Sequence, residues 1–189
     1  MMEGTATVSA MSLALFPSVF DTARLHARRM DEIHLPLIAA MHADGRLMAT
    51  MGGTRGFTAS QLYLQRNVAH WREHGFGMYV LSERDGGALV GRAGLKRAIA
   101  RDGIELAYAF LPDSWGRGYA TEIAQALLAL GFGRLPVDAL AAVALDDNAA
   151  SCRVLEKCGM RHVAMPDAAG AGKRRYEIRR AEWRAMVSA

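Results

Sequence analysis

Residues 114–122 read SWGRGYATE and join two different periodic patterns. A strand-like pattern, GIELAYAFL at 103–111, precedes them, and an apolar helical pattern, IAQALLALGF at 123–132, follows. The first turn of a helix has N–H groups without an internal partner and carries partial positive charge. Gly116 and Gly118 would let the backbone approach a ligand closely. The stretch therefore predicts a backbone cradle for a phosphate or pyrophosphate, with a tight turn that binds nothing as the alternative.

Two nucleotide-binding motifs do not fit this cradle. A Walker A loop needs Gly-Lys-Ser or Gly-Lys-Thr, which the sequence lacks. A dinucleotide fingerprint, G-x-G-x-x-G, needs a third glycine where Thr121 stands. It also needs an acidic residue at the end of the next strand, whereas Asp138 stands at the start of its expected strand. Both nucleotide classes are therefore disfavoured.

Length and composition favour one domain of ordinary size. The chain has 189 residues, of which 51% are hydrophobic, and no apolar run is long enough to cross a membrane. Residues 1–20 lack Lys and Arg, so we expect a flexible tail there rather than a signal peptide, followed by a single domain at 21–189. Cys152 and Cys158 have no metal-binding spacing, which indicates free thiols in a reducing cytoplasm. The net charge of +4 comes without a dense basic cluster interleaved with aromatics, so no nucleic-acid partner is expected.

The remaining patterns alternate between strands and helices. Strands are expected at 22–30, 76–83, 88–98, 103–111, 138–145, 161–165 and 174–180, and helices at 31–43, 58–74, 119–134 and 148–158. Thr58 is the expected N-cap of its helix, and Gly159 the expected end of the last one. This order predicts an α/β or α+β sheet with helices on both faces.

Several blocks, in order and spacing, resemble the GNAT superfamily of acyl-CoA-dependent N-acyltransferases, and most of all its branch that acetylates the N-termini of ribosomal proteins. The blocks are DTARLHAR, HWREHGFGMYVL, LVGRAGL, ELAYAFLPDSWGRGYATE and DDNAASCRVLEKCGM. The resemblance covers residues 22 to about 183. It implies a mostly antiparallel, mixed sheet of about six to seven strands that splays in its middle, with acetyl-CoA as co-substrate and no metal.

The resemblance also assigns cofactor contacts. The family's phosphate loop, Q/R-x-x-G-x-G/A, corresponds here to residues 115–120, with Trp115 in place of the polar first residue. It implies that backbone amides hold the pyrophosphate of coenzyme A, from Gly116, Arg117, Gly118, Tyr119, Ala120 and Thr121. The pantetheine arm would pair with backbone groups of Phe110 and Leu111 where strands 104–111 and 138–145 splay apart. A bulge near 107–109 would help to open that gap.

Strand alternation singles out a candidate general base. Ile104, Leu106, Tyr108 and Phe110 share one face of their strand, and the other face carries Glu105 beside Ala107 and Ala109. Small neighbours leave room for an amine or a water, so Glu105 is the expected base, directly or through water. The resemblance supports this position. A solvated or salt-bridged glutamate is the alternative.

Helical spacing places Ser151 on an apolar face with Val154, Leu155 and Cys158. The tyrosine acid that many family members carry at the Leu155 position is absent, and the resemblance instead assigns Ser151 to the sulfur of coenzyme A, with plain helix packing as the alternative. Asn148 would hold the cofactor's amide arm or cap its helix. Arg153 would reach a phosphate of coenzyme A or pair with Glu156 or Glu122.

The segment HWREH at 70–74 matches H-x-x-E-H, a zinc-protease pattern. No third ligand has suitable spacing downstream, so no metal site is expected. In the resembling branch this helix lies on the acceptor side, and Trp71 and Arg72 could line the acceptor pocket or lie at the surface.

These observations predict a cytoplasmic N-acetyltransferase that moves an acetyl group from acetyl-CoA to a primary amine by direct attack in a ternary complex. The acceptor amine would belong to a protein N-terminus or to a small molecule. The sequence is also compatible with a homodimer. Segment 51–75 carries Arg55, Arg66 and Arg72 against Glu73, which favours a peptide, an amino acid or an acidic amine over a polycation. The alternative is a non-catalytic acyl-CoA-binding or sensing module.

Overall fold

A computed structural model describes residues 15–98, 103–165 and 172–188. One eight-stranded sheet runs through them in the order β1-β2-β3-β4-β5-β6-β8-β7, and all neighbours are antiparallel except β5 and β6. The strands are β1 (Val19–Asp21), β2 (Leu25–Arg29), β3 (Met78–Glu83), β4 (Leu89–Arg97), β5 (Ile104–Phe110), β6 (Ala139–Leu145), β7 (Arg161–Val163) and β8 (Lys173–Arg179). The predicted mixed sheet is confirmed; the count exceeds six to seven because the three-residue strand β1 is added to the seven expected strands.

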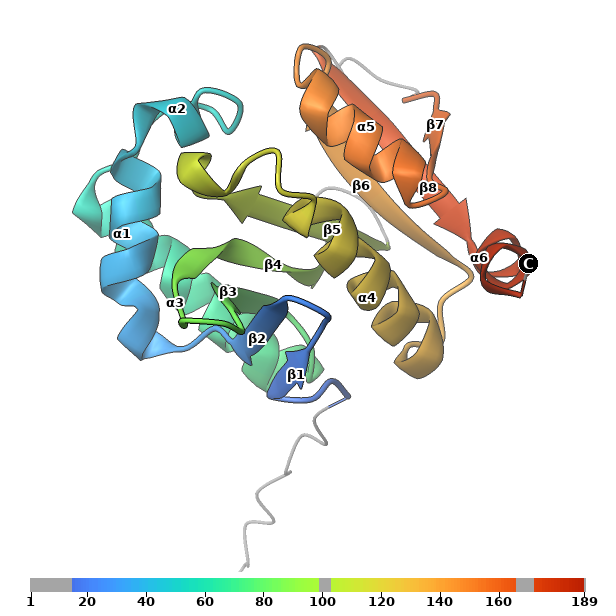
Figure 1. Cartoon of the computed structure of the whole chain (residues 1–189), viewed down its shortest axis with the longest axis horizontal. Coiled ribbons are helices and arrows are strands. Elements are labelled where there is room, and N and C mark those ends of the chain that lie inside the picture. Colours follow the sequence, from blue (N-terminus) through green and yellow to red (C-terminus); the bar gives the residue numbers. More distant parts are fainter. Residues whose placement is uncertain (1–14, 99–102, 166–171, 189) are drawn as a thin grey trace, which may run out of the picture.

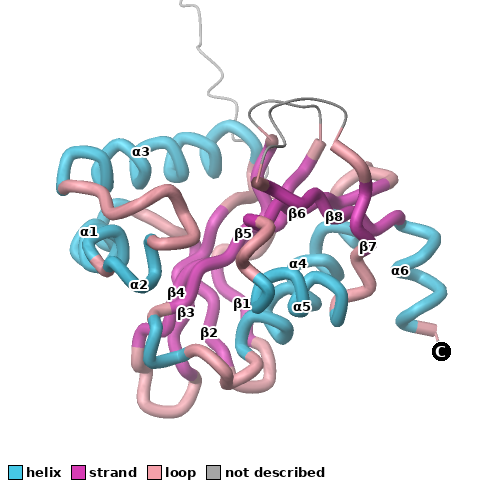
Figure 2. Tube along the Cα trace, turned by 90° about the horizontal axis from the view of Figure 1, so that it is seen from above, coloured by secondary structure: helices cyan, strands magenta, loops and turns pink. Residues whose placement is uncertain are grey.

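Helices cover both faces of the sheet, as predicted. They are α1 (Leu35–Ala43), α2 (Gly45–Met48), α3 (Phe57–His74), α4 (Tyr119–Arg134), α5 (Ala149–Lys157) and α6 (Arg180–Val187), with short 3₁₀ turns η1 (Glu32–His34) and η2 (Pro112–Ser114). Figure 2 shows α1, α2 and α3 on one side of the sheet and α4 and α5 on the other. In Figure 1 the strands β6 and β8 diverge from the β2–β5 half of the sheet. The largest core cluster packs α4 and α5 against the sheet, and two smaller clusters lie under α1 and α3.

Alternating side chains explain why β5 serves both layers. Leu106 and Phe110 belong to the large core cluster, whereas Ala107 and Ala109 pack in the clusters of the α1–α3 side.

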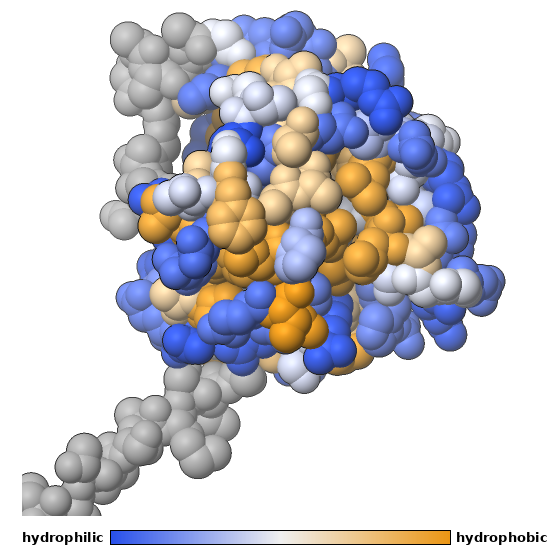
Figure 3. Space-filling view, turned by 90° about the vertical axis from the view of Figure 1, so that its left-hand side faces the viewer, coloured by the Kyte–Doolittle hydropathy of each residue, from blue (hydrophilic) through white to orange (hydrophobic). Residues whose placement is uncertain are grey.

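The face of the molecule on the α1 and α2 side shows apolar side chains in its middle with polar ones around them (Figure 3). None of the helices within the described ranges is long and apolar enough to span a bilayer.

Several sequence predictions need correction. The strand expected at 22–30 is a turn followed by β2, and β1 lies ahead of the expected range. Phe16 is also buried in the core, so the fold includes residues ahead of 21. Residues 1–14 of the expected tail lie outside the described residues. The N-cap of α3 is Gly56 rather than Thr58, and the helix expected from residue 31 begins as the turn η1, capped by Asp31. Neither α2 nor α6 was predicted, because each is a short helix beside a stronger pattern.

Candidate functional site

The loop between β5 and α4 has the geometry of an anion cradle. Gly116 and Gly118 have φ angles of +73° and +80°, which only glycine adopts without strain. Gly118 is the N-cap of α4, and in the described part of the chain no side chain caps that first turn. The N–H groups from Tyr119 to Thr121 are therefore open toward a negatively charged ligand.

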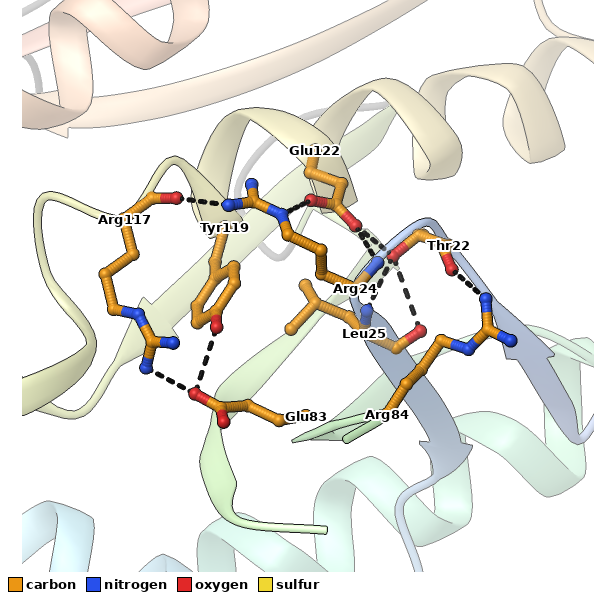
Figure 4. Close-up of polar contacts among 8 residues, drawn as sticks. All are labelled: Thr22, Arg24, Leu25, Glu83, Arg84, Arg117, Tyr119 and Glu122. Carbon is orange, nitrogen blue, oxygen red and sulfur yellow. Dashed lines mark hydrogen bonds and ion pairs between the residues drawn. The ribbon is translucent and has the colours of Figure 1, made fainter. Parts of the chain in front are cut away.

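Arg24, in the turn before β2, holds this loop in place (Figure 4). Its guanidinium donates through Nη1 to the carbonyl of Arg117 at 2.8 Å and through Nε to Glu122 at 2.7 Å. Glu122 also accepts from the hydroxyl of Thr22 at 2.6 Å. Burial opposes ionisation of Glu122, but the bonds from Thr22 and Arg24 outweigh it and hold the pKa of Glu122 below its usual value. The first turn of α4 is thus fixed to the edge of the sheet.

Glu83 at the end of β3 holds the other side of the loop (Figure 4). It pairs with the guanidinium of Arg117 and accepts from the hydroxyl of Tyr119 at 2.9 Å. The guanidinium groups of Arg24 and Arg117 lie 4.9 and 4.7 Å from the centre of the Tyr119 ring. Because its side chain is engaged with Glu83, Arg117 presents its backbone rather than its charge to the cradle.

The sheet opens between β5 and β6. These strands pair at only two positions, Glu105 with Ala141 and Leu106 with Ala142, whereas β4 and β5 stay in register over seven positions. The bulge expected at 107–109 is absent, because the register of β5 against β4 is unbroken there; the irregularity lies at Leu81/Ser82, between β3 and β4. The splay therefore forms without an extra residue in β5.

Backbone groups of β5 face this opening. Leu111 donates its N–H to Val90 of β4 at 2.8 Å, so it points away from the gap. In an antiparallel ladder, alternate residues point away from the partner strand, which turns Phe110 and Tyr108 toward the opening. The carbonyl of Phe110 also accepts from Nε1 of Trp115 at 2.7 Å. Of the two expected positions, Phe110 faces the gap and Leu111 does not.

A cavity of about 210 Å³ lies at the splay and brings together Glu105, Tyr108 and Ser151. Lys96, which lies opposite Glu105 in the register of β4 and β5, and Met51 also line it. Residues 105 and 151 were singled out from separate patterns, and the fold places them in one cavity.

Tyr108 is the residue that sequence reasoning missed. Its hydroxyl lies 2.9 Å from Oγ of Ser151 and donates to the Ser151 carbonyl at 3.2 Å. Burial raises its pKa well above the ordinary tyrosine value, although the bond to Ser151 works in the opposite direction. The side chain therefore stays protonated across the physiological range. A tyrosine on an otherwise apolar strand face was the available signal, because a buried hydroxyl needs a partner.

The N-terminus of α5 positions Ser151. The side-chain oxygen of Asn148 accepts from the N–H of Ser151 at 3.0 Å, so Asn148 caps the helix. Arg153 is exposed on the outer face of α5. Within the described ranges neither glutamate considered for it is its partner, because Glu122 binds Arg24 and Glu156 accepts from a tyrosine.

The HWREH segment belongs to the core and surface of α3. Nε2 of His70 accepts from the N–H of Arg97 at 3.0 Å, so Nδ1 donates to the carbonyl of Phe76 at 2.9 Å. Both ring nitrogens are thus used by the backbone, and burial lowers the pKa of His70. Trp71 is buried and Arg72 forms a surface ion pair with Glu32, so neither lines the cavity. No cluster that could hold a metal ion occurs among the described residues.

Known proteins share this architecture. The family model described as "Acetyltransferase (GNAT) domain" matches residues 24–161. The uncharacterized protein YkkB of Bacillus subtilis (strain 168) is 27% identical over 144 residues, covering 75% of this chain and 84% of the relative. An acetyltransferase from Agrobacterium tumefaciens superposes with a TM-score of 0.78 at 23% identity, covering 86% of this chain and 94% of the other. The ribosomal L7/L12 alpha-N-protein acetyltransferase RimL, in complex with coenzyme A, gives 0.72 at 16% identity, with 85% and 97% covered.

Proposed function

Since the chain belongs to the GNAT acetyltransferase family, we propose that it transfers an acetyl group from acetyl-CoA to a primary amine by direct attack in a ternary complex. The observation that carries the proposal is the cavity at the splay, which is lined both by Glu105 and by the hydrogen-bonded pair of Tyr108 and Ser151. The buried free thiols Cys152 and Cys158 fit a cytoplasmic protein.

The glycine loop suits the pyrophosphate of coenzyme A. Open N–H groups at the start of α4, from Tyr119 to Thr121, would bind its oxygens, helped by the glycines at 116 and 118. The pantetheine arm carries amides spaced like a peptide and would pair with the gap-facing groups of Phe110 and Tyr108. Exposed Arg153 and the amide of Asn148 remain candidates for outer contacts. The thioester would then lie in the cavity at the splay.

The side chains of the cavity supply what acyl transfer requires. The nitrogen attacks the thioester carbonyl, a C–N bond forms and the C–S bond breaks. Glu105 takes the proton that the amine releases, directly or through water. The departing thiolate receives a proton from the hydroxyl pair of Tyr108 and Ser151, and the buried, protonated Tyr108 is the stronger candidate donor. Tyr108 thereby takes the place of the tyrosine that is absent at Leu155.

Thiol release from acetyl-CoA tests this function. The panel pairs the full-length protein with N-terminal peptides, amino acids, a polyamine and an aminoglycoside, and calorimetry measures binding of coenzyme A in parallel. Turnover with any amine supports the enzyme. Binding of coenzyme A without turnover would favour a sensing module, and absence of binding would overturn the assignment of the loop.

A further inference from the structure

Arg92 of β4 is a cation buried inside the protein. Only 3% of it is exposed, and its Nε has no hydrogen-bond partner within the described residues. No carboxylate in the described ranges forms an ion pair with it. Arginine stays charged at all physiological pH values, and a buried charge without a counterion is costly. The guanidinium therefore has unused capacity to bind an anion.

The groups around Arg92 do not neutralise it. Nη1 donates to the hydroxyl of Tyr63 of α3, and the guanidinium carbon lies 4.6 Å from the centre of the Tyr63 ring. Nη2 lies 4.0 Å from the sulfur of Met51. His42 packs edge-on against Tyr63 at 4.9 Å, and burial lowers its pKa to about 4, helped by the charges of Arg92 and Arg55, so it is neutral at pH 7. Arg92 is therefore surrounded by neutral groups and by a second cation, Arg55, rather than by an anion.

This cluster adjoins the cavity on the α1–α3 face of the sheet, opposite the face that α4 covers. Met51 both contacts Arg92 and lines the cavity that holds Glu105. On β4, Lys96 lies opposite Glu105 and Arg92 lies opposite Ala109, and alternate residues of a strand share one face. Arg92 is thus on the same face as Glu105, roughly 13 Å further along the strand by Cα positions. The side chains of Arg92 and Glu105 are long, so their charged ends can lie closer together than their Cα atoms.

We propose that Arg92, with Arg55 and Tyr63, binds a carboxylate carried by the acceptor amine, after the side chain of Met51 moves aside. Arg55 comes from the same loop as Met51 and donates to the Met51 carbonyl at 3.2 Å. A planar guanidinium matches a carboxylate in geometry, and burial strengthens the pairing. The inference rests on the proposed function and narrows it: amines whose only charge is positive, such as polyamines, are poor acceptors.

The test compares amines that differ only in the carboxylate. Amino acids and dipeptides are assayed with acetyl-CoA against their C-terminal amides, using the full-length protein and variants. We expect the acids to be preferred at least about tenfold in kcat/KM. In Arg92→Gln, kcat/KM for the acids should fall about 10- to 100-fold while that for the amides changes by less than about threefold. Arg66→Gln, which removes an exposed charge from α3, should leave the preference intact.

A second measurement separates this inference from the proposed function. Calorimetry titrates N-acetyl amino acids and their amides onto protein saturated with coenzyme A. Carboxylate-dependent binding that is lost in Arg92→Gln supports the inference even without turnover, an outcome that would overturn the enzyme itself. Turnover without an acid preference, or a preference that survives Arg92→Gln, overturns the inference. If Arg92→Gln unfolds, Arg92→Lys and Tyr63→Phe must weaken the preference while the melting temperature and coenzyme A binding are unchanged.

Discussion

The two ends of the candidate site are built in opposite ways. The cradle at residues 114–122 is one continuous segment that offers backbone N–H groups, with its side chains engaged elsewhere. The acceptor end is assembled from a strand, two helices and a loop, and it offers the side chains of Arg92, Tyr63 and Arg55. On these proposals the co-substrate is held by backbone groups, whereas acceptor choice depends on side chains. Changes at the two ends should therefore have separable effects.

The sharpest break between the ends should come from Glu105→Gln. Loss of a general base lowers kcat by about 10²–10³-fold, with little change in the affinity for coenzyme A. Steady-state kinetics and calorimetry measure the two quantities. An equal loss of coenzyme A affinity would show that Glu105 belongs to the cofactor end and would remove its role as base.

Acid should destabilise the folded protein through His42, which packs against Tyr63 at the acceptor end. The pKa of His42 is lowered to about 4 in the folded protein, so the unfolded chain binds the proton first as the pH falls below the ordinary value of 6.5. The free energy of unfolding should therefore fall between pH 6.5 and 4, by up to about 3 kcal/mol.

Urea unfolding at several pH values checks this, with His42→Gln and, as a control, the exposed His162→Gln. The dependence of the free energy of unfolding on pH should become weaker in His42→Gln only. An unchanged slope in that variant would assign the acid sensitivity to other groups.

A change confined to the cradle is Gly118→Val. Gly118 has a φ of +80°, which is strained for any residue with a side chain, and an added Cβ would lie 3.3 Å from Nη2 of Arg24. The strain of about 1–2 kcal/mol should weaken coenzyme A binding roughly 5- to 30-fold without changing acceptor preference. Gly133→Ala is the control, because that exposed glycine of α4 has open space around it. If acceptor preference shifted too, the two ends would be coupled.

The smallest effect is expected where the ends meet. Tyr108→Phe removes the hydroxyl bonded to Ser151 and should lower kcat about tenfold if it protonates the thiolate. Because burial keeps Tyr108 protonated, the wild-type rate should not decline through loss of this proton below about pH 10. Ser151→Ala alone should cost less. A Tyr108→Phe enzyme with full activity would return the donor role to Ser151 or water.

The sequence predicted the loop and helix that form the cradle far better than the residues gathered at the acceptor end. The cradle is local: glycines followed by a helical pattern define it, and α4 spans the predicted residues 119–134. The faces of β5 were also readable, because alternation alone sets them. Helix boundaries were less so, since Thr58 and Gly56 are both acceptable caps and packing decides between them.

The acceptor end could not be predicted because its contacts join distant segments. Arg92 sits in an apolar strand pattern, and nothing near it in sequence shows that Tyr63 and Met51 will surround it. Trp71, expected either to line the acceptor pocket or to lie at the surface, instead donates to the Met78 carbonyl inside the core. Tyr108 needed the position of α5 to find its partner. Such pairings follow from how helices and loops pack on the sheet rather than from any motif.

The side chain of Trp115 gives the chain a built-in optical reporter. It is 51% exposed beside the cradle, and its indole N–H is fixed on the Phe110 carbonyl, whereas Trp71 and Trp183 are 2% and 8% exposed. Indole emission depends on contact with water, so the two buried rings form a constant background. A ligand that covers the loop shields one of the three tryptophans from water. Its binding can therefore be followed by intrinsic tryptophan fluorescence, without a label.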